Sequence, residues 1–383
     1  MNTATQPDEP DKPEDTARPS PAPAPPPRPV FELTASPYFA AWLAAQRASL
    51  VFTTYQTAKV FFIGLQPNGR LSIFERTLER VMGLSASAST LHLNTLYQIW
   101  RFENALAPGE TFQGYDAVYT PRESRVTGEL DVHDVAVDDA GRVLFSNTLF
   151  NCLATTDPGH SFRVVWKPPW ISRLAPEDRC HLNGLALRDG KPRYATSVSR
   201  SDVTDGWRDK RRGSGVVVDI DSNEVVCEGL SMPHSPRWHR GSLYLIDSGS
   251  GFFGRVDFEK RRFERLVFCP GFARGLAFSG DWALIGLSDR RENRTFQDLE
   301  FEENLRARDA ETRAGLLVVD LRTFETPHWL RLGGVVRELY DVGVLEGIVR
   351  AMAVGFRSDE IRRYISFAPE GPESRAKIQG DTE

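Results

Sequence analysis

The sequence predicts an all-β protein: a six-bladed β-propeller closed by N-terminal strands that pair with the C-terminal strand. Short apolar runs bounded by Gly, Asp, Asn and Pro recur along most of the 383-residue chain, which is typical of strands joined by turns. These runs group into similar units that repeat roughly every 40–50 residues, the size of a four-stranded propeller blade. Long amphipathic helical periods are scarce.

Three regions of different composition divide the chain. Residues 1–30 are acidic and proline-rich, so we expect a disordered tail there, and they lack the apolar segment of a secretory signal peptide. The propeller is expected over 31–357 and a polar tail over 358–383. Helices are predicted at 36–47, where Ser36 suits the cap and Pro37 the first turn, and near 297–310.

Six segments align on a special or polar residue that precedes a short apolar strand, a turn and a second strand. The residues at this position are Met82, His133, Asn183, His234, Arg274 and Arg350. The last segment, VRAMAVGF, contains one strand only. Three runs near the N-terminus, SLVFTTYQ, AKVFFIGL and RLSIFER, have no unit of their own. Joining them to the last segment completes a sixth blade and removes exposed sheet edges.

Composition excludes several classes of protein. The net charge of −5 argues against a nucleic-acid-binding domain, and no apolar run is long enough for a transmembrane helix. The four cysteines form no CxxC pair, which favours buried thiols in a reducing, cytoplasmic compartment. The sequence contains no phosphate-binding loop, dinucleotide fingerprint or GxSxG elbow.

The six aligned positions should meet at one mouth of the central channel, because the innermost strand of each blade lines that channel. Arginines and histidines around one cavity make it electropositive, and guanidinium groups bind carboxylate, phosphate or sulfate. We therefore expect Arg274 and Arg350 to bind a small anionic molecule, with Asn183 orienting it. The alternative is that both arginines tie neighbouring blades together.

Three histidines raise the question of a metal ion. His133, His181 and His234 could ligate zinc or iron(II), His133 or His234 could act as an acid or base without metal, or all three could be structural. Asp134 could orient a histidine, pair with an arginine or satisfy the backbone at the strand start.

Two polar insertions, at 199–215 and 289–313, follow second strands and are expected on the same face as the ring. Long loops in compact domains are often lids or binding loops. An equal alternative is that each insertion is a solvent-exposed surface loop without a binding role. Trp207 and Arg208 are the lid residues expected to contact a ligand. Second-strand ends such as Asn147 and Asp247 could bind the ligand or cap turns.

Two resemblances extend this interpretation. The segments LNGLALRDG and HSPRWHRGSLYLIDSGSG resemble inner-strand motifs of gluconolactonase/strictosidine-synthase-like six-bladed propellers, a resemblance that implies a divalent-metal ligand at Asn183. The other aligned positions depart from the oxygen ligands of a calcium site. Over residues 35–357, motifs such as LYQIWRFEN, HDVAVD and MPHSPRWH resemble a bacterial family of uncharacterised conserved hypothetical propellers.

Two functions remain open from the sequence. In the first, the protein is an enzyme that acts on a small anionic substrate by hydrolysis, elimination or isomerisation, with His133 and His234 as metal ligands or acid–base groups. In the second, it is a non-catalytic propeller that binds a peptide or partner protein. The fold alone does not decide between them.

Overall fold

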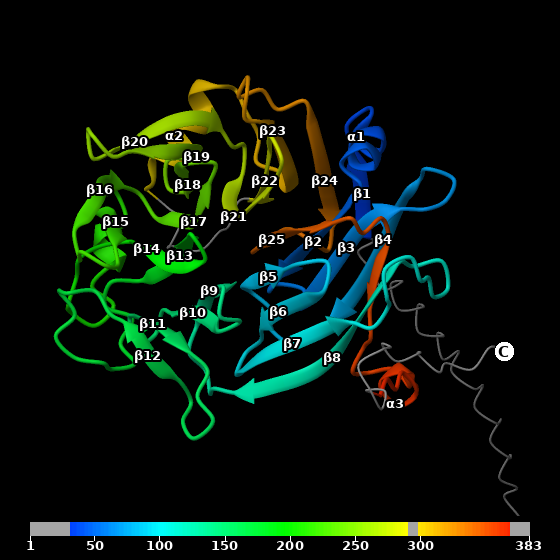
Figure 1. The fold of residues 1–383 in the computed structure, drawn as a ribbon. Helices are drawn as coiled ribbons and strands as arrows, with labels where there is room; N and C mark the ends of the chain where they lie inside the picture. Colours follow the sequence, from blue (N-terminus) through cyan, green and yellow to red (C-terminus); the bar gives the residue numbers. More distant parts are fainter. Residues whose placement is uncertain (1–30, 290–297, 368–383) are drawn as a thin grey trace, which may run out of the picture.

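The computed structural model describes residues 31–289 and 298–367. These residues form six sheets that stand as blades around a central channel (Figure 1). The predicted six-bladed, all-β architecture is confirmed. The tail predicted at 1–30 lies outside the described residues.

Each blade has four strands, ordered from the channel outward. The first blade contains β25 (Val342–Glu346), β2 (Ala48–Thr54), β3 (Lys59–Leu65) and β4 (Leu71–Thr77), and the second contains β5 (Leu84–Ala86), β6 (Thr90–Asn94), β7 (Gln98–Asn104) and β8 (Ala117–Val126). The third contains β9 (Val132–Val137), β10 (Val143–Asn147), β11 (Cys152–Thr155) and β12 (Arg163–Trp166), and the fourth contains β13 (Leu182–Arg188), β14 (Lys191–Ser197), β15 (Gly215–Asp219) and β16 (Val225–Leu230). The fifth contains β17 (Pro233–His239), β18 (Ser242–Asp247), β19 (Phe252–Asp257) and β20 (Arg262–Phe268), and the sixth contains β21 (Phe272–Ser279), β22 (Trp282–Ser288), β23 (Ala314–Asp320) and β24 (His328–Gly334).

Two blades gain a fifth strand at their outer edge. β1 (Phe31–Ala35) pairs antiparallel with β24, and β26 (Ala351–Ala353) pairs parallel with β8. Both strands cover an edge that would otherwise expose unpaired backbone groups.

The ring closes as predicted through the N-terminal strands β2 to β4, but with a different C-terminal partner. β2 pairs antiparallel with β25, Val342–Glu346, which is the inner strand of the first blade. The segment VRAMAVGF, predicted to be that inner strand, instead supplies β26 on the outside of the second blade. Both candidates are short apolar runs, so hydrophobicity alone did not distinguish them.

The helices lie outside the blades. α1 (Phe39–Gln46) begins later than predicted, because Tyr38 adopts a left-handed conformation with φ 64°. Ser36 therefore does not cap the helix, and its hydroxyl accepts a hydrogen bond from the Trp329 backbone N–H. α2 (Glu300–Ala307) matches the helix predicted near 297–310. A 3₁₀ turn (Arg208–Lys210) and α3 (Glu360–Arg363) complete the helical residues described.

Apolar side chains fill the spaces between neighbouring blades, and buried hydroxyl groups connect the blades at one end. A Thr or Ser at or just past the end of a second strand donates to a backbone carbonyl at or just before the start of the next inner strand. The four pairs are Thr53 to Met82 at 2.5 Å, Thr148 to Leu182 at 2.6 Å, Ser248 to Ala273 at 2.6 Å and Ser288 to Leu339 at 3.0 Å. These bonds fix the register between blades.

Removing one of these hydroxyls should cost measurable stability. Ser288→Ala leaves both the carbonyl and the N–H of Leu339 without the buried Oγ that now serves them. We expect the free energy of unfolding to fall by about 1–2 kcal/mol, the range for unpaired buried polar groups. Urea unfolding measures this free energy, and Ser89→Ala, at an exposed position, is the control. Equal stability of the two variants would contradict the role given to the Ser288 hydrogen bond.

Candidate functional site

The hydroxyl bonds identify the equivalent residue of four of the six inner strands. The residue directly after each bonded carbonyl is Gly83, Asn183, Arg274 or Tyr340, and the sequence repeat aligns His133 and His234 with them. We call these six residues the first ring: Gly83, His133, Asn183, His234, Arg274 and Tyr340. Of the predicted residues, the hydroxyl bonds place Asn183 and Arg274 at this position, whereas Gly83 stands there instead of Met82 and Tyr340 instead of Arg350.

Arg350 lies away from the channel, on the outer part of the propeller. Its Nε donates to Ser72 Oγ at 3.0 Å and its Nη1 to the Gly114 carbonyl at 3.3 Å, and the guanidinium carbon is 4.2 Å from the centre of the Tyr115 ring. The prediction that Arg350 binds a ligand in the ring is therefore wrong. It ties β4 to the loop before β8, which is the alternative that the sequence left open.

His133 and His234 are buried and held in the same way in two different blades. The Nδ1 of His133 lies 2.9 Å from the Asp131 carbonyl and 3.0 Å from Thr148 Oγ1. The Nδ1 of His234 lies 2.8 Å from the Met232 carbonyl and 3.0 Å from Ser248 Oγ. A carbonyl oxygen only accepts, so Nδ1 carries the proton in each neutral ring. Nε2 is then left with a lone pair, as an acceptor or base needs.

His181 forms a dyad with Asp178 beside the first ring. Its Nδ1 donates to Asp178 Oδ2 at 2.9 Å, and the same oxygen accepts the Trp207 indole N–H at 2.7 Å. Burial opposes ionisation of Asp178, but His181 and Trp207 among its partners bring its pKa below the ordinary value. The His181 ring packs edge-on against His133 with centroids 4.8 Å apart and stacks on Trp207 at 4.0 Å.

Arg274 and Tyr340 complete the ring from the sixth and first blades. The guanidinium carbon of Arg274 lies 5.2 Å from the centre of the Tyr340 ring and 5.3 Å from that of Phe272. Tyr340 also approaches His133, with ring centroids 5.8 Å apart, although a whole blade stands between them. The intervening blade presents Gly83, which has no side chain to fill this space.

Burial keeps His133, His234 and Tyr340 neutral, and the Arg274 charge acts in the same direction on the two histidines. Burial lowers the pKa of His133 to about 4 against the raising effect of Asp131, and His181 and Arg274 lower it further. Burial and Arg274 also place the pKa of His234 well below its ordinary value. Burial raises the pKa of Tyr340 well above its usual range. At neutral pH the first ring therefore combines the uncharged imidazoles of His133 and His234, the Tyr340 phenol with its proton retained and the Arg274 guanidinium cation.

Three polar atoms of the first ring are buried without a hydrogen-bond partner among the residues described: His234 Nε2, Asn183 Nδ2 and Tyr340 Oη. Their residues are 2–4% exposed. Each such atom costs about 1–3 kcal/mol, so their presence in one ring indicates a place for a ligand or ordered water. Tyr340 was missed by the sequence analysis, although LYDVG aligns with the LNGLA of the fourth blade.

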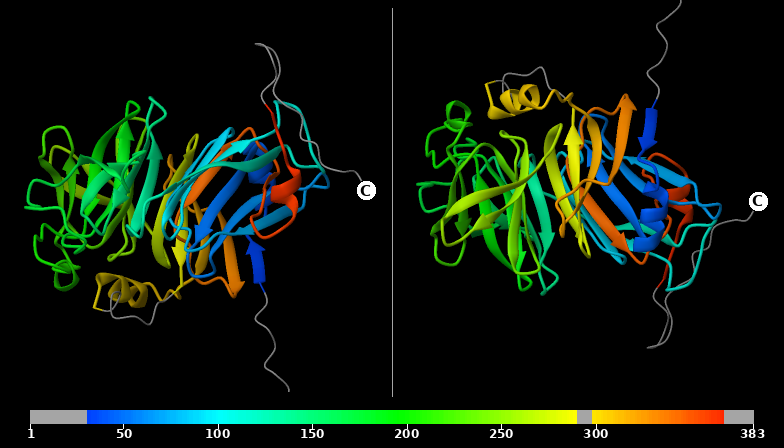
Figure 2. Two further views of the ribbon diagram at one scale, coloured as in Figure 1. Left: turned by 90° about the horizontal axis from the view of Figure 1, so that it is seen from below. Right: turned by 90° about the horizontal axis from the view of Figure 1, so that it is seen from above.

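Both polar insertions meet on the first-ring face, where α2 stands out from the propeller (Figure 2). An apolar cluster joins Trp207 of one insertion to Leu299, Phe301 and Leu305 of the other, and Arg212 pairs with Glu303 at 3.1 Å. Trp207 is buried against His181, whereas the exposed Arg208 pairs with Asp205 at 2.9 Å. Residues 290–297 lie outside the described part of this insertion.

The arrangement of the histidines does not form a metal centre in the described part of the chain. No group of three or more His, Cys, Asp or Glu side chains there is placed to hold a metal ion. The three imidazoles proposed as zinc or iron ligands therefore do not fit as a set, and we derive no step through a metal.

Asp134 belongs to a buried ion cluster below the first ring. Arg237 donates to both oxygens of Asp134, at 2.8 and 2.9 Å, and lies 3.7 Å from Asp341 Oδ1. Asp134 also accepts the Leu185 backbone N–H at 3.1 Å. Of the roles considered for Asp134, the structure shows the arginine partner and the backbone acceptor. We call Asp134, Arg237 and Asp341 the channel plug.

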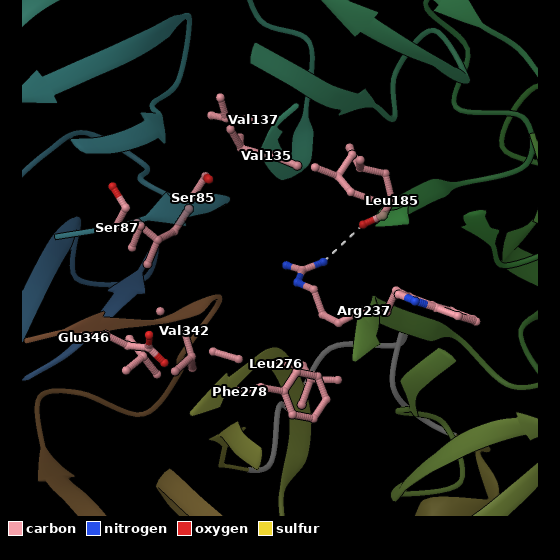
Figure 3. Close-up of a pocket in the computed structure, with 18 of the residues that line it drawn as sticks. Ser85, Ser87, Val135, Val137, Leu185, Arg237, Leu276, Phe278, Val342 and Glu346 are labelled. Carbon is pink, nitrogen blue, oxygen red and sulfur yellow. Dashed lines mark hydrogen bonds between the residues drawn. The ribbon is translucent and has the colours of Figure 1, made fainter. Parts of the chain in front are cut away.

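A cavity of about 650 Å³ lies on the other side of the plug. Its walls come from the inner strands of all six blades, and Arg237 projects into it from β17 (Figure 3). In every blade its lining residues follow the first-ring residue along the chain. The channel thus has two separate ends.

All four cysteines are buried free thiols, which agrees with the small-hydrophobe role predicted for them. Within the described ranges, every helix is too short or too polar to cross a membrane.

Comparison with known proteins gives a family and distant structural similarity. Similar solved structures include a nidogen/laminin complex, with 14% sequence identity, a TM-score of 0.48 and coverage of 78% of this chain and 99% of that chain. A protein of unknown function from Bacteroides caccae has 11% identity, a TM-score of 0.47 and coverage of 78% of this chain and 98% of that chain. A catalytically inactive variant of virginiamycin B lyase from Staphylococcus aureus with quinupristin has 11% identity, a TM-score of 0.38 and coverage of 79% of this chain and 99% of that chain. No curated protein matches the sequence. The family model described as a domain of unknown function, DUF4915, matches residues 37–354, and the chain belongs to that family.

Proposed function

We propose that the first ring is an acid–base catalytic site that binds a small molecule through an anionic group. The observation that carries this proposal is the set of three buried, unpaired polar atoms on His234, Asn183 and Tyr340. They offer one acceptor and two donors. A purely structural ring would satisfy these atoms within the protein or replace them with apolar groups.

The charge distribution supports an anionic ligand. Arg274 is the cation of the first ring, and burial holds the neighbouring histidines neutral. An anion bound beside Arg274 would offset the positive potential that now lowers the histidine pKa values, so ligand binding favours proton uptake by His133 or His234. The same site can therefore bind the ligand and receive a proton from it.

Each side chain has a distinct role in this proposal. His234 Nε2 accepts a proton from the substrate, Tyr340 donates a hydrogen bond to the oxygen on which negative charge develops, and Arg274 attracts the anionic group. The His181–Asp178 dyad positions His133 through their edge-on contact. Hydrolysis, elimination and isomerisation all need such a proton transfer. A peptide or protein partner is the competing ligand.

Thermal shift with a panel of carboxylates, phosphates and sulfates tests the anion requirement. We expect at least one anion to stabilise the wild type and Arg274→Met to lose that response. Arg350→Met is the matched control, because Arg350 lies outside the ring, and it should respond like the wild type. Equal responses from Arg274→Met and wild type would overturn the role of Arg274, and binding of peptides alone would favour the non-catalytic alternative.

Tyr340→Phe separates a functional from a structural role. It removes only a buried hydroxyl without a partner, so the free protein should be at least as stable as the wild type. Affinity for the stabilising anion should nevertheless fall roughly tenfold, as expected for the loss of a hydrogen bond to a charged group. A variant that is destabilised but binds the anion normally would contradict this assignment.

A further inference from the structure

The second end of the channel has the features of a separate binding site. Its volume of about 650 Å³ falls within the range of small-molecule pockets. Five of the six inner strands contribute small or aliphatic side chains at the level nearest the plug: Ser85, Val135, Leu185, Leu276 and Val342 (Figure 3). The remaining strand, β17, contributes Arg237 because its pairing with β18 is irregular between His234 and Arg237, as at a β-bulge that redirects a side chain.

Arg237 is the most exposed member of the plug. Its side chain is 22% exposed, compared with 3% for Asp134 and 4% for Asp341. A molecule in the cavity therefore meets the cation first, with both carboxylates behind it. The other charged residue of the lining is Glu346, which ends β25 and is exposed.

Arg237 keeps one edge of its guanidinium group available. Nη1 donates to Asp134 Oδ2 and to the carbonyls of Leu185 and Pro236, and Nη2 donates to Asp134 Oδ1. Among the described residues no hydrogen bond uses Nε, and the nearest acid to Nη2 on its remaining side is Asp341 at 3.7 Å. Nε and Nη2 together form the second fork with which a guanidinium binds a carboxylate.

We infer that this cavity binds a small carboxylate with an apolar body, its head group on the Nε–Nη2 edge of Arg237 and its body against the aliphatic walls. The site is independent of the first ring, from which the plug separates it. It differs in chemistry, because the first ring offers imidazoles and a phenol, whereas this cavity offers mainly small and aliphatic side chains around one guanidinium.

Binding in this cavity should depend on pH through the plug. Burial raises the pKa of Asp341 to about 7, against the lowering effect of Arg237, and Asp134 raises it further. Besides these two charges, Asp341 faces the backbone N–H groups of Leu84 and Val342. A carboxylate on Arg237 adds negative charge nearby and favours protonated Asp341. Affinity should therefore be higher at pH 6 than at pH 8.

The test uses isothermal titration calorimetry of the full chain with octanoate, octylamine and 1-octanol, which share one apolar body. Octanoate should bind at least about tenfold more tightly than the other two, the effect of a charge-assisted hydrogen bond. Octyl phosphate, a second oxyanion, distinguishes a planar carboxylate site from a general oxyanion site. Preference for octylamine or equal binding of the three octyl compounds would overturn the inference.

Ser85→Trp locates the site without disturbing the plug. Ser85 lines the cavity and is half-buried, so an indole there occupies ligand space. Octanoate affinity should fall at least about tenfold, whereas Ser89→Trp, in the exposed turn after β5, should bind normally. Unchanged binding by a folded Ser85→Trp would refute this site. His234→Ala should leave octanoate binding intact, so failure here and failure of the first-ring proposal are distinguishable.

Discussion

Arg237→Met is expected to lower the free energy of unfolding by about 3–5 kcal/mol, the cost of removing one partner from a buried ion pair. Asp134 is nearly inaccessible and receives both of its guanidinium bonds from Arg237. Methionine fills similar space but leaves the Asp134 carboxylate uncompensated. Asp341 loses its nearest cation as well.

Urea unfolding at pH 8 measures this loss. The informative control is the double variant Arg237→Met/Asp134→Asn, in which the unpaired charge is removed and the amide oxygen still accepts the Leu185 N–H. We expect the double variant to recover more than half of the lost stability. If it is as unstable as Arg237→Met alone, the plug stabilises the propeller by packing and not by charge pairing.

Asp247→Asn is expected to stabilise the protein by about 2–3 kcal/mol at pH 8 and to have no effect at pH 4. Asp247 ends β18 and is buried; burial raises its pKa to about 6, although hydrogen bonds from Ser250 and Ser231 act in the opposite direction. An asparagine at this position still accepts the Ser231 N–H and can donate to Ser250 Oγ. The hydrogen bonds are kept and only the ionisation is lost.

Proton linkage determines in which direction the effect of Asp247→Asn on stability changes with pH. An aspartate ionises near pH 3.8 in the unfolded chain and near pH 6 in the native protein, so the native state binds the proton more tightly. Asp247 therefore does not lower the free energy of unfolding below pH 4, lowers it progressively between pH 4 and 6, and lowers it by the full amount above pH 6. The difference in unfolding free energy between the two proteins should follow this curve. A constant difference from pH 4 to 8 would contradict the raised pKa.

The two ends of the channel give the molecule two proposed sites with different tests. The first ring lies beneath Trp207 and α2 and contains neutral imidazoles next to a cation. The opposite cavity has mostly small and aliphatic side chains around Arg237, and no histidine lines it. Variants at Arg274 and Tyr340 affect the first site, and Ser85→Trp affects the second.

Much of the candidate site could be predicted from the repeat. His133, Asn183, His234 and Arg274 occupy equivalent places because each lies at the start of an inner strand with a similar apolar pattern. Arg237 carried no such signal, since the irregular pairing of β17 shifts it relative to the other blades. The His181–Asp178–Trp207 contacts join a strand start to an insertion, and sequence spacing does not encode that approach.

By itself, the sequence determined the propeller, its six blades and the closure through the N-terminal strands, because turn residues and apolar periodicity are local and each blade repeats them. The tertiary structure decided which short C-terminal strand lines the channel, and with it that Tyr340 rather than Arg350 enters the first ring. The physical reason is that β25 and β26 are both brief and apolar. Only their hydrogen-bonded register with the distant strands β2 and β8 distinguishes an inner strand from an outer edge.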